Sequence, residues 1–133
     1  MKLTFAVNKS PEFIFDYLTD MDKFVSIHPL ISKIENLGKN HYLAHETLKF
    51  GFIPYSFTYP VTIEKDEAEK KIVMKAVVQK MTHIEMHFTI RDSGHSSTVE
   101  EEISIKSFLP VKGFIQKIFR KQHEQLFYNI DKL

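Results

Sequence analysis

The sequence predicts an α+β domain in which an antiparallel sheet of about seven strands is covered by one long C-terminal helix. Three patterns predict it. Apolar and polar residues alternate through most of residues 32–107, short turn-forming links separate these runs, and helical spacing takes over at residues 110–133. Short links favour antiparallel hairpins in chain order. The length of 133 residues suits a single domain, residues 1–133.

The first elements are one strand and two short helices. Alternation within residues 3–7 predicts the strand. Ser10 is the expected N-cap of the first helix and Pro11 its first residue, because proline there loses no helical hydrogen bond. A second short helix is expected over residues 21–27, ended by Pro29.

Period-two alternation dominates the middle of the chain. We expect strands at residues 32–38, 41–50, 55–65, 71–81, 83–91 and 97–107. Each would be apolar on one face and polar on the other, which is typical of a sheet with one solvated face. Pro60 predicts a sheet edge or a bulge, because proline cannot donate to a strand ladder. Only the helix over residues 110–133 is long enough to cover the apolar face.

Composition excludes several kinds of site. The chain has no cysteine, so disulfides, thiolate zinc sites and cysteine nucleophiles are excluded. Eighteen Lys and Arg against seventeen Asp and Glu give a net charge of +1, which disfavours a nucleic-acid partner. Neither a glycine-rich phosphate loop nor an HExxH helix occurs, and we expect no metal and no cofactor.

The sequence also shows no targeting signal. No signal peptide is recognisable at the start, and no uncharged run approaches the roughly 18 residues that a membrane-spanning helix needs. We therefore expect a cytoplasmic protein without a transmembrane segment, present as a monomer or a weak dimer.

Residues 10–20, SPEFIFDYLTD, followed by HPLI at residues 28–31, resemble the opening of START-like (SRPBCC) proteins. This superfamily has the helix-grip fold and includes the birch-pollen allergen group and the polyketide cyclase/dehydrase-like group. The resemblance covers essentially the whole chain and implies a curved sheet around the last helix, with a hydrophobic cavity between them. Members bind or transfer lipids, sterols and isoprenoid quinones, cyclise polyketides or interact with proteins, so no single activity follows.

Aromatic and methionine side chains are the main candidates for a ligand pocket. The chain has twelve Phe and five Tyr, and pockets for apolar ligands are lined by such rings. The predicted cavity walls are Phe57, Tyr59, Met74, Met86, Phe88, Ile103, Phe114, Ile118 and Phe119. The alternative is that the same side chains simply fill the core, since protein interiors pack tightly.

Two carboxylates are expected on the apolar face. Glu46 shares a strand face with Leu48, and Glu101 shares one with Val99. A carboxylate there is costly unless it is paired, and it can orient a polar ligand end or act as a general acid or base. His123 lies beside the apolar stripe of the last helix, where it could reach the cavity mouth. These three are the candidate catalytic residues, and a purely structural pairing is the favoured alternative.

The leading hypothesis is a non-enzymatic protein that binds or transports a small hydrophobic ligand, such as a lipid, an isoprenoid or a polyketide-like molecule. The first alternative is a polyketide cyclase- or dehydratase-like enzyme that uses the inward carboxylates. The second is a protein-interaction domain with a filled core, whose partner would contact the apolar loop at residues 50–55.

Overall fold

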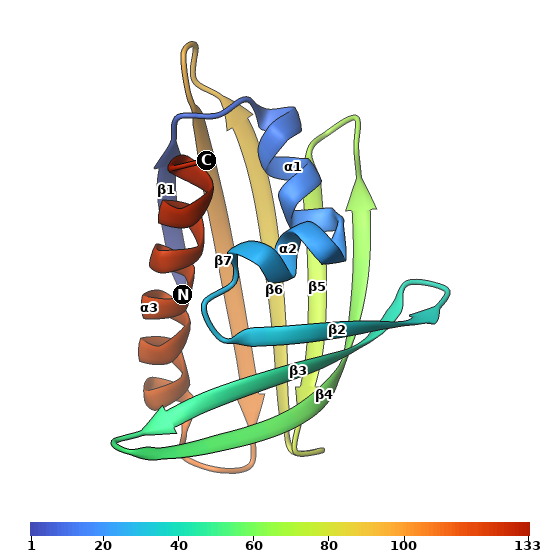
Figure 1. The fold of residues 1–133 in the computed structure, drawn as a ribbon, viewed down its shortest axis with the longest axis vertical. Coiled ribbons are helices and arrows are strands. Elements are labelled where there is room, and N and C mark those ends of the chain that lie inside the picture. The colour runs from blue at the N-terminus through green and yellow to red at the C-terminus, as the bar shows by residue number, and fades with distance from the viewer.

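The computed structural model describes residues 1–133 as seven strands and three helices (Figure 1). In chain order these are β1 (Lys2–Val7), α1 (Pro11–Thr19), α2 (Met21–Ile27), β2 (Ile31–Gly38), β3 (His41–Phe50), β4 (Ile53–Asp66), β5 (Lys71–Val78), β6 (Thr82–Asp92), β7 (Ser97–Ser107) and α3 (Lys112–Asp131). The strands form one antiparallel sheet in the order β1-β7-β6-β5-β4-β3-β2. The predicted helix-grip fold is therefore confirmed.

The two short helices begin where the sequence predicts, and local hydrogen bonds explain why. The hydroxyl of Ser10 accepts the backbone N–H of Phe13 at 3.1 Å, and Pro11 opens α1. Asp20 ends α1 and caps α2, because its carboxylate accepts the backbone N–H of Asp22 at 3.1 Å. One residue thus separates the helices and sets the bend between them.

Tight turns connect the strands. Gly51 and Phe52 form the two-residue turn between β3 and β4, and Gly51 has a φ of +65°, which glycine adopts without strain. Gln79 and Lys80 have φ values of +55° and +58° in the β5–β6 turn. The prediction of a strand over residues 71–81 was therefore too long, because the chain turns after Val78.

The long strand β4 changes partners at Pro60. Residues 53–60 pair with β3 only, and pairing with β5 begins at Val61, opposite Ala76. Pro60, which has no N–H to donate, lies where the β5 side of the strand is unpaired, so the predicted local edge is confirmed. Beyond this point β3 and β4 form an arm that extends away from β5 toward the start of α3 (Figure 1).

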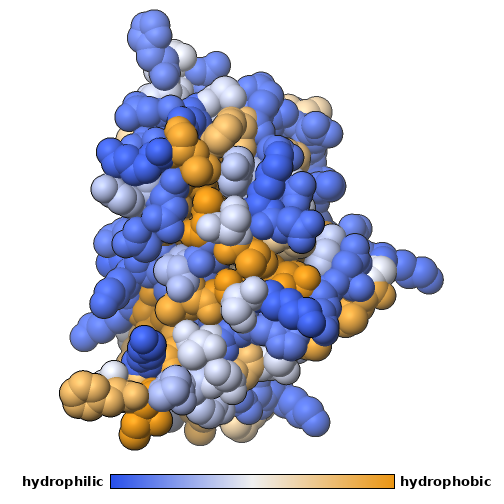
Figure 2. All heavy atoms as spheres, in the orientation of Figure 1, coloured by the Kyte–Doolittle hydropathy of each residue, from blue (hydrophilic) through white to orange (hydrophobic).

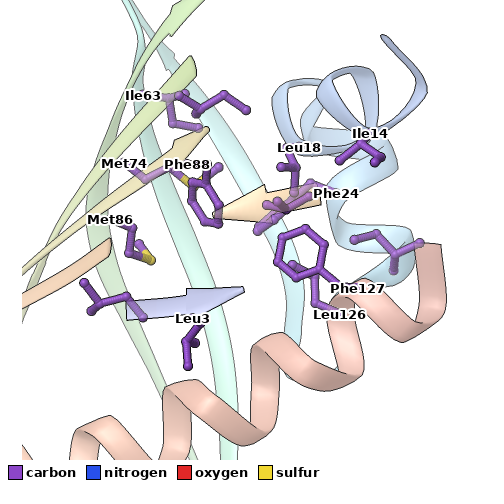
Figure 3. Close-up of a cluster of buried hydrophobic side chains, with 14 of the residues drawn as sticks. Leu3, Ile14, Leu18, Phe24, Ile63, Met74, Met86, Phe88, Leu126 and Phe127 are labelled. Carbon is purple, nitrogen blue, oxygen red and sulfur yellow. The ribbon is translucent and has the colours of Figure 1, made fainter. Parts of the chain in front are cut away.

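All three helices cover the apolar face of the sheet, so the expectation that the long helix alone covers it was wrong. α1 packs on β6, α2 on β2, and α3 on β1 and β7. In Figure 3, side chains from these helices gather on one side, and side chains of β4, β5 and β6 point toward them from the other. The core cluster contains 24 buried apolar residues, and the predicted inward faces of β4 to β7 belong to it.

Candidate functional site

A cavity of about 250 Å³ lies between the sheet and the helices, and 24 of its 30 lining residues are hydrophobic. Its walls come from β2 to β6, α2, the β7–α3 loop and α3, and neither β1 nor β7 contributes a residue. The cavity reaches the surface between the β5–β6 turn and the start of α3, where Met81, Leu109 and Phe114 line it while staying exposed. Apolar atoms are visible from this side of the molecule (Figure 2).

Eight of the nine side chains predicted to wall a cavity do line it. These are Phe57, Tyr59, Met74, Met86, Phe88, Phe114, Ile118 and Phe119. The prediction for Ile103 was wrong. Ile103 is buried on β7, where β1 and β7 lie directly under α3 and leave no open space.

Glu46 is the centre of a polar group in the cavity wall. Its side chain is only 8% exposed, and the Tyr59 hydroxyl donates to its Oε1 at 2.6 Å. Gln122 of α3 donates from Nε2 to Oε2 at 3.4 Å. Burial raises the pKa of Glu46, and both hydrogen bonds oppose that rise because they favour the charged form. The predicted inward orientation of Glu46 is confirmed.

Burial also raises the pKa of Tyr59 well above its ordinary value, and the adjacent Glu46 adds to this effect. The phenol therefore keeps its proton and stays a donor to the carboxylate. Tyr59 belongs to a row of rings on β4, with ring centroids 5.7 Å apart for Phe57 and Tyr59 and 5.5 Å apart for Tyr55 and Phe57. The row runs from the polar group toward the exposed end of the arm.

His28 also lines the cavity, just after α2. Its Nδ1 accepts the backbone N–H groups of Leu30 at 3.1 Å and Ile31 at 3.0 Å. Burial lowers the pKa of His28 from 6.5 to about 3, and the nearby His123 contributes to the decrease. The ring is therefore neutral at pH 7 and carries its proton on Nε2, which makes that nitrogen a hydrogen-bond donor.

Glu101 and His123 form a second buried pair, between β7 and α3. Nδ1 of His123 lies 2.6 Å from Oε1 of Glu101, and the residues are 3% and 1% exposed. His123 lines the cavity, whereas Glu101 lies behind it. The inward orientation of Glu101 is confirmed, but its expected direct contact with a ligand is not supported, because His123 stands between it and the open space. The second oxygen, Oε2, has no hydrogen-bond partner.

Sequence reasoning missed His28 and Gln122. Gln122 occupies a buried position in the apolar stripe of α3, and a polar residue at such a position was the available signal. His28 lies between a helix and Pro29, outside any periodic pattern, so the sequence held no signal for it. Together with Glu46, Tyr59 and His123 they give an otherwise apolar cavity a few donors and acceptors, which can orient the polar end of a bound molecule.

The sequence profile of CoxG, a family described as a component of carbon monoxide dehydrogenase, matches residues 4–121. The chain belongs to the CoxG family. No curated protein matches the sequence of this CoxG-family protein.

Solved structures share the fold of this CoxG-family protein at low sequence identity. A START superfamily protein from Mycobacterium smegmatis has a TM-score of 0.82 at 17% identity, covering 99% of this chain and 94% of that one. Ara h 8.0201 has a TM-score of 0.80 at 13% identity, with coverage of 99% and 94%. The di-domain ARO/CYC BexL has a TM-score of 0.82 at 10% identity, covering 98% of this chain and 45% of that longer one. The START-like superfamily expected from the sequence is therefore confirmed, and its known folds include ligand binders and polyketide cyclases.

Two further features of this CoxG-family protein bear on the site. No three His, Asp or Glu side chains lie close enough together to hold a metal ion. None of the helices combines the length and the apolar character needed to cross a bilayer.

Proposed function

We propose that this protein binds and carries a small amphipathic molecule in the cavity between its sheet and α3. The apolar body of the ligand would lie against Phe57, Met74 and Phe88. Its polar end would face Glu46 and His123, which are close enough to influence each other electrostatically. The observation that carries this proposal is the cavity of about 250 Å³, walled by 24 hydrophobic residues.

A filled-core interaction domain agrees less well with this geometry. Well-packed interiors contain few voids larger than a water molecule, and a space of about 250 Å³ is far above that size. The few polar groups at its wall are buried at a cost that a polar ligand end would help to offset. Ligand binding therefore explains both the empty volume and the polar side chains.

Two neighbouring positions on β5 allow a matched test. Ala76 lines the cavity, and Val77 faces the opposite side of the sheet. The Ala76→Phe variant should fill part of the cavity and block binding, whereas the Val77→Phe control should bind normally. Native mass spectrometry of protein purified without detergent should show a non-covalent adduct on wild type and control only. An adduct on all three proteins would contradict the proposal. So would a wild type that carries no adduct and does not bind the apolar dye 1-anilinonaphthalene-8-sulfonate.

We infer a second candidate, acid–base catalysis on a bound polyketide-like substrate, from the state of Glu46. A carboxyl with a raised pKa beside an apolar cavity can exchange a proton with a substrate near neutral pH. Glu46→Gln should then abolish turnover in a polyketide cyclisation assay while native mass spectrometry still shows the adduct. Equal turnover in wild type and Glu46→Gln would eliminate this candidate and leave the carrier function.

A further inference from the structure

The exposed apolar side chains of the chain are concentrated at one end of the molecule. Eight of its eleven exposed large hydrophobic residues lie in the β3–β4 turn, the β5–β6 turn, and the β7–α3 loop with the start of α3. They are Phe50, Phe52, Ile53, Tyr55, Met81, Phe108, Leu109 and Phe114. We call these turns, with the first half of α3, the mouth surface, because the cavity opens among them.

Phe52 and Phe108 are the most exposed of these, at 103% and 93%. They lie at the tips of two segments far apart in sequence, the β3–β4 turn and the β7–α3 loop, and both segments lie at the lower end of the view in Figure 1. Apolar atoms protrude at this corner in Figure 2. The rings of Phe50 and Phe114 stack with centroids 6.2 Å apart, which holds the two segments beside each other.

The charge at this end is entirely positive. Residues 47–63, 76–84 and 103–123 contain no Asp or Glu, yet they carry seven basic residues. These are Lys49, Lys80, Lys106, Lys112, Lys117, Arg120 and Lys121, all exposed and none of them in a salt bridge. Taking these seven from the eighteen Lys and Arg leaves eleven against seventeen Asp and Glu in the rest of the chain. A nearly neutral protein is therefore strongly polarised, with its cations gathered around the mouth.

The start of α3 adds to the positive potential. Its N-cap residue, Val111, makes no side-chain capping bond, and the first turn holds no acidic residue. The positive end of the helix dipole is therefore not offset, and Lys112 lies beside it. Cationic groups around protruding apolar tips form the pattern by which proteins attach to anionic lipid surfaces, where the tips enter the interface and the cations contact headgroup phosphates.

We propose that the mouth surface docks on an anionic lipid bilayer. Phe52 and Phe108 insert among the headgroups and acyl chains, and the unpaired lysines contact the phosphates. Docked in this way, the cavity opens directly onto the lipid. Vesicle binding by this surface does not depend on which molecule the cavity holds.

The test is co-sedimentation of the full chain with vesicles of phosphatidylcholine alone or mixed with phosphatidylglycerol. Wild type should bind the mixed vesicles, and added salt should weaken binding, because exposed charges are screened. The variants Phe52→Ser/Phe108→Ser and Lys49→Glu/Lys112→Glu should each lower partitioning about tenfold or more. A matched control, Leu37→Ser/Lys39→Glu, changes an exposed leucine and a lysine near the β2–β3 turn, away from the mouth, and should bind as wild type does.

A second measurement does not depend on any loss of binding. The chain has no tryptophan, so Phe52→Trp introduces a single fluorophore at the tip of the arm. Its emission should shift to the blue on mixed vesicles, while a Leu37→Trp control should not shift. Absence of wild-type binding to mixed vesicles at low salt would overturn the proposal and favour an acidic protein as partner. Unchanged partitioning of both mouth variants would also overturn it.

Discussion

The strands β1 and β7 are covered by α3, whereas β3, β4 and β5 face open space. Both regions have the same alternation of inward apolar and outward polar residues. On the β1–β7 side the inward side chains, such as Val99 and Ile103, are buried against helices and line no cavity. On the β3–β5 side, Tyr59 and Met74 point into a void. Alternation therefore determines which face of a strand is inside, and the path of the helices determines whether that inside is packed or hollow.

The largest effect is expected where the two regions meet, at the pair of Glu101 and His123. His123→Ala leaves a buried carboxylate without its partner and should lower the free energy of unfolding by about 3–5 kcal/mol. Replacing both residues by leucine should recover most of the loss, because an apolar pair leaves no charge buried. Urea denaturation measures both variants. A loss below about 1 kcal/mol in His123→Ala would show that the pair carries no buried charge.

The comparison itself can be tested by trimming one side chain in each region. Leu18 is fully buried on α1 and does not line the cavity, so Leu18→Ala should cost about 2–5 kcal/mol of unfolding free energy. Phe57 already borders the void, so Phe57→Ala should cost about 1 kcal/mol. Equal losses in urea denaturation would mean that the cavity side is packed as tightly as the helix-covered side.

A smaller effect concerns pH and the cavity side alone. The pKa of His28 is about 3 in the folded protein and ordinarily 6.5, so below pH 6.5 the unfolded chain binds a proton that the folded chain does not. Stability should therefore fall as the pH drops from 6.5 toward 3, and the loss at pH 5 relative to pH 7 is about 2 kcal/mol.

His28→Asn provides the check on this pH dependence, because a side-chain oxygen can accept the same backbone N–H groups without titrating. The variant should lose less stability than wild type between pH 7 and pH 5. An identical loss in both proteins would assign the acid sensitivity to another group.

Sequence periodicity was enough for the fold and for the orientation of most inward side chains. Glu46 and Glu101 were placed on the apolar face because each lies two residues from an apolar neighbour on a strand. The same reasoning failed for Ile103, because alternation holds no information on which helix crosses a strand. It failed for His28, because that side chain is oriented by backbone N–H groups within a turn. The cavity boundary follows from packing over long sequence distances, and local patterns do not encode it.

The change of partner at Pro60 has a consequence for the timing of exchange with the cavity. The outer part of the β3–β4 arm is held by β3–β4 pairing, by the Phe50–Phe114 stack and by the Gln79 amide, which donates to the Tyr55 hydroxyl at 3.1 Å. Releasing the last two contacts breaks no bond of the β5–β6–β7 ladder. The arm can therefore open without global unfolding. Amide protons of residues 53–60 should accordingly exchange with deuterium faster than those of β6, and the residence time of a bound molecule would be governed by this local opening.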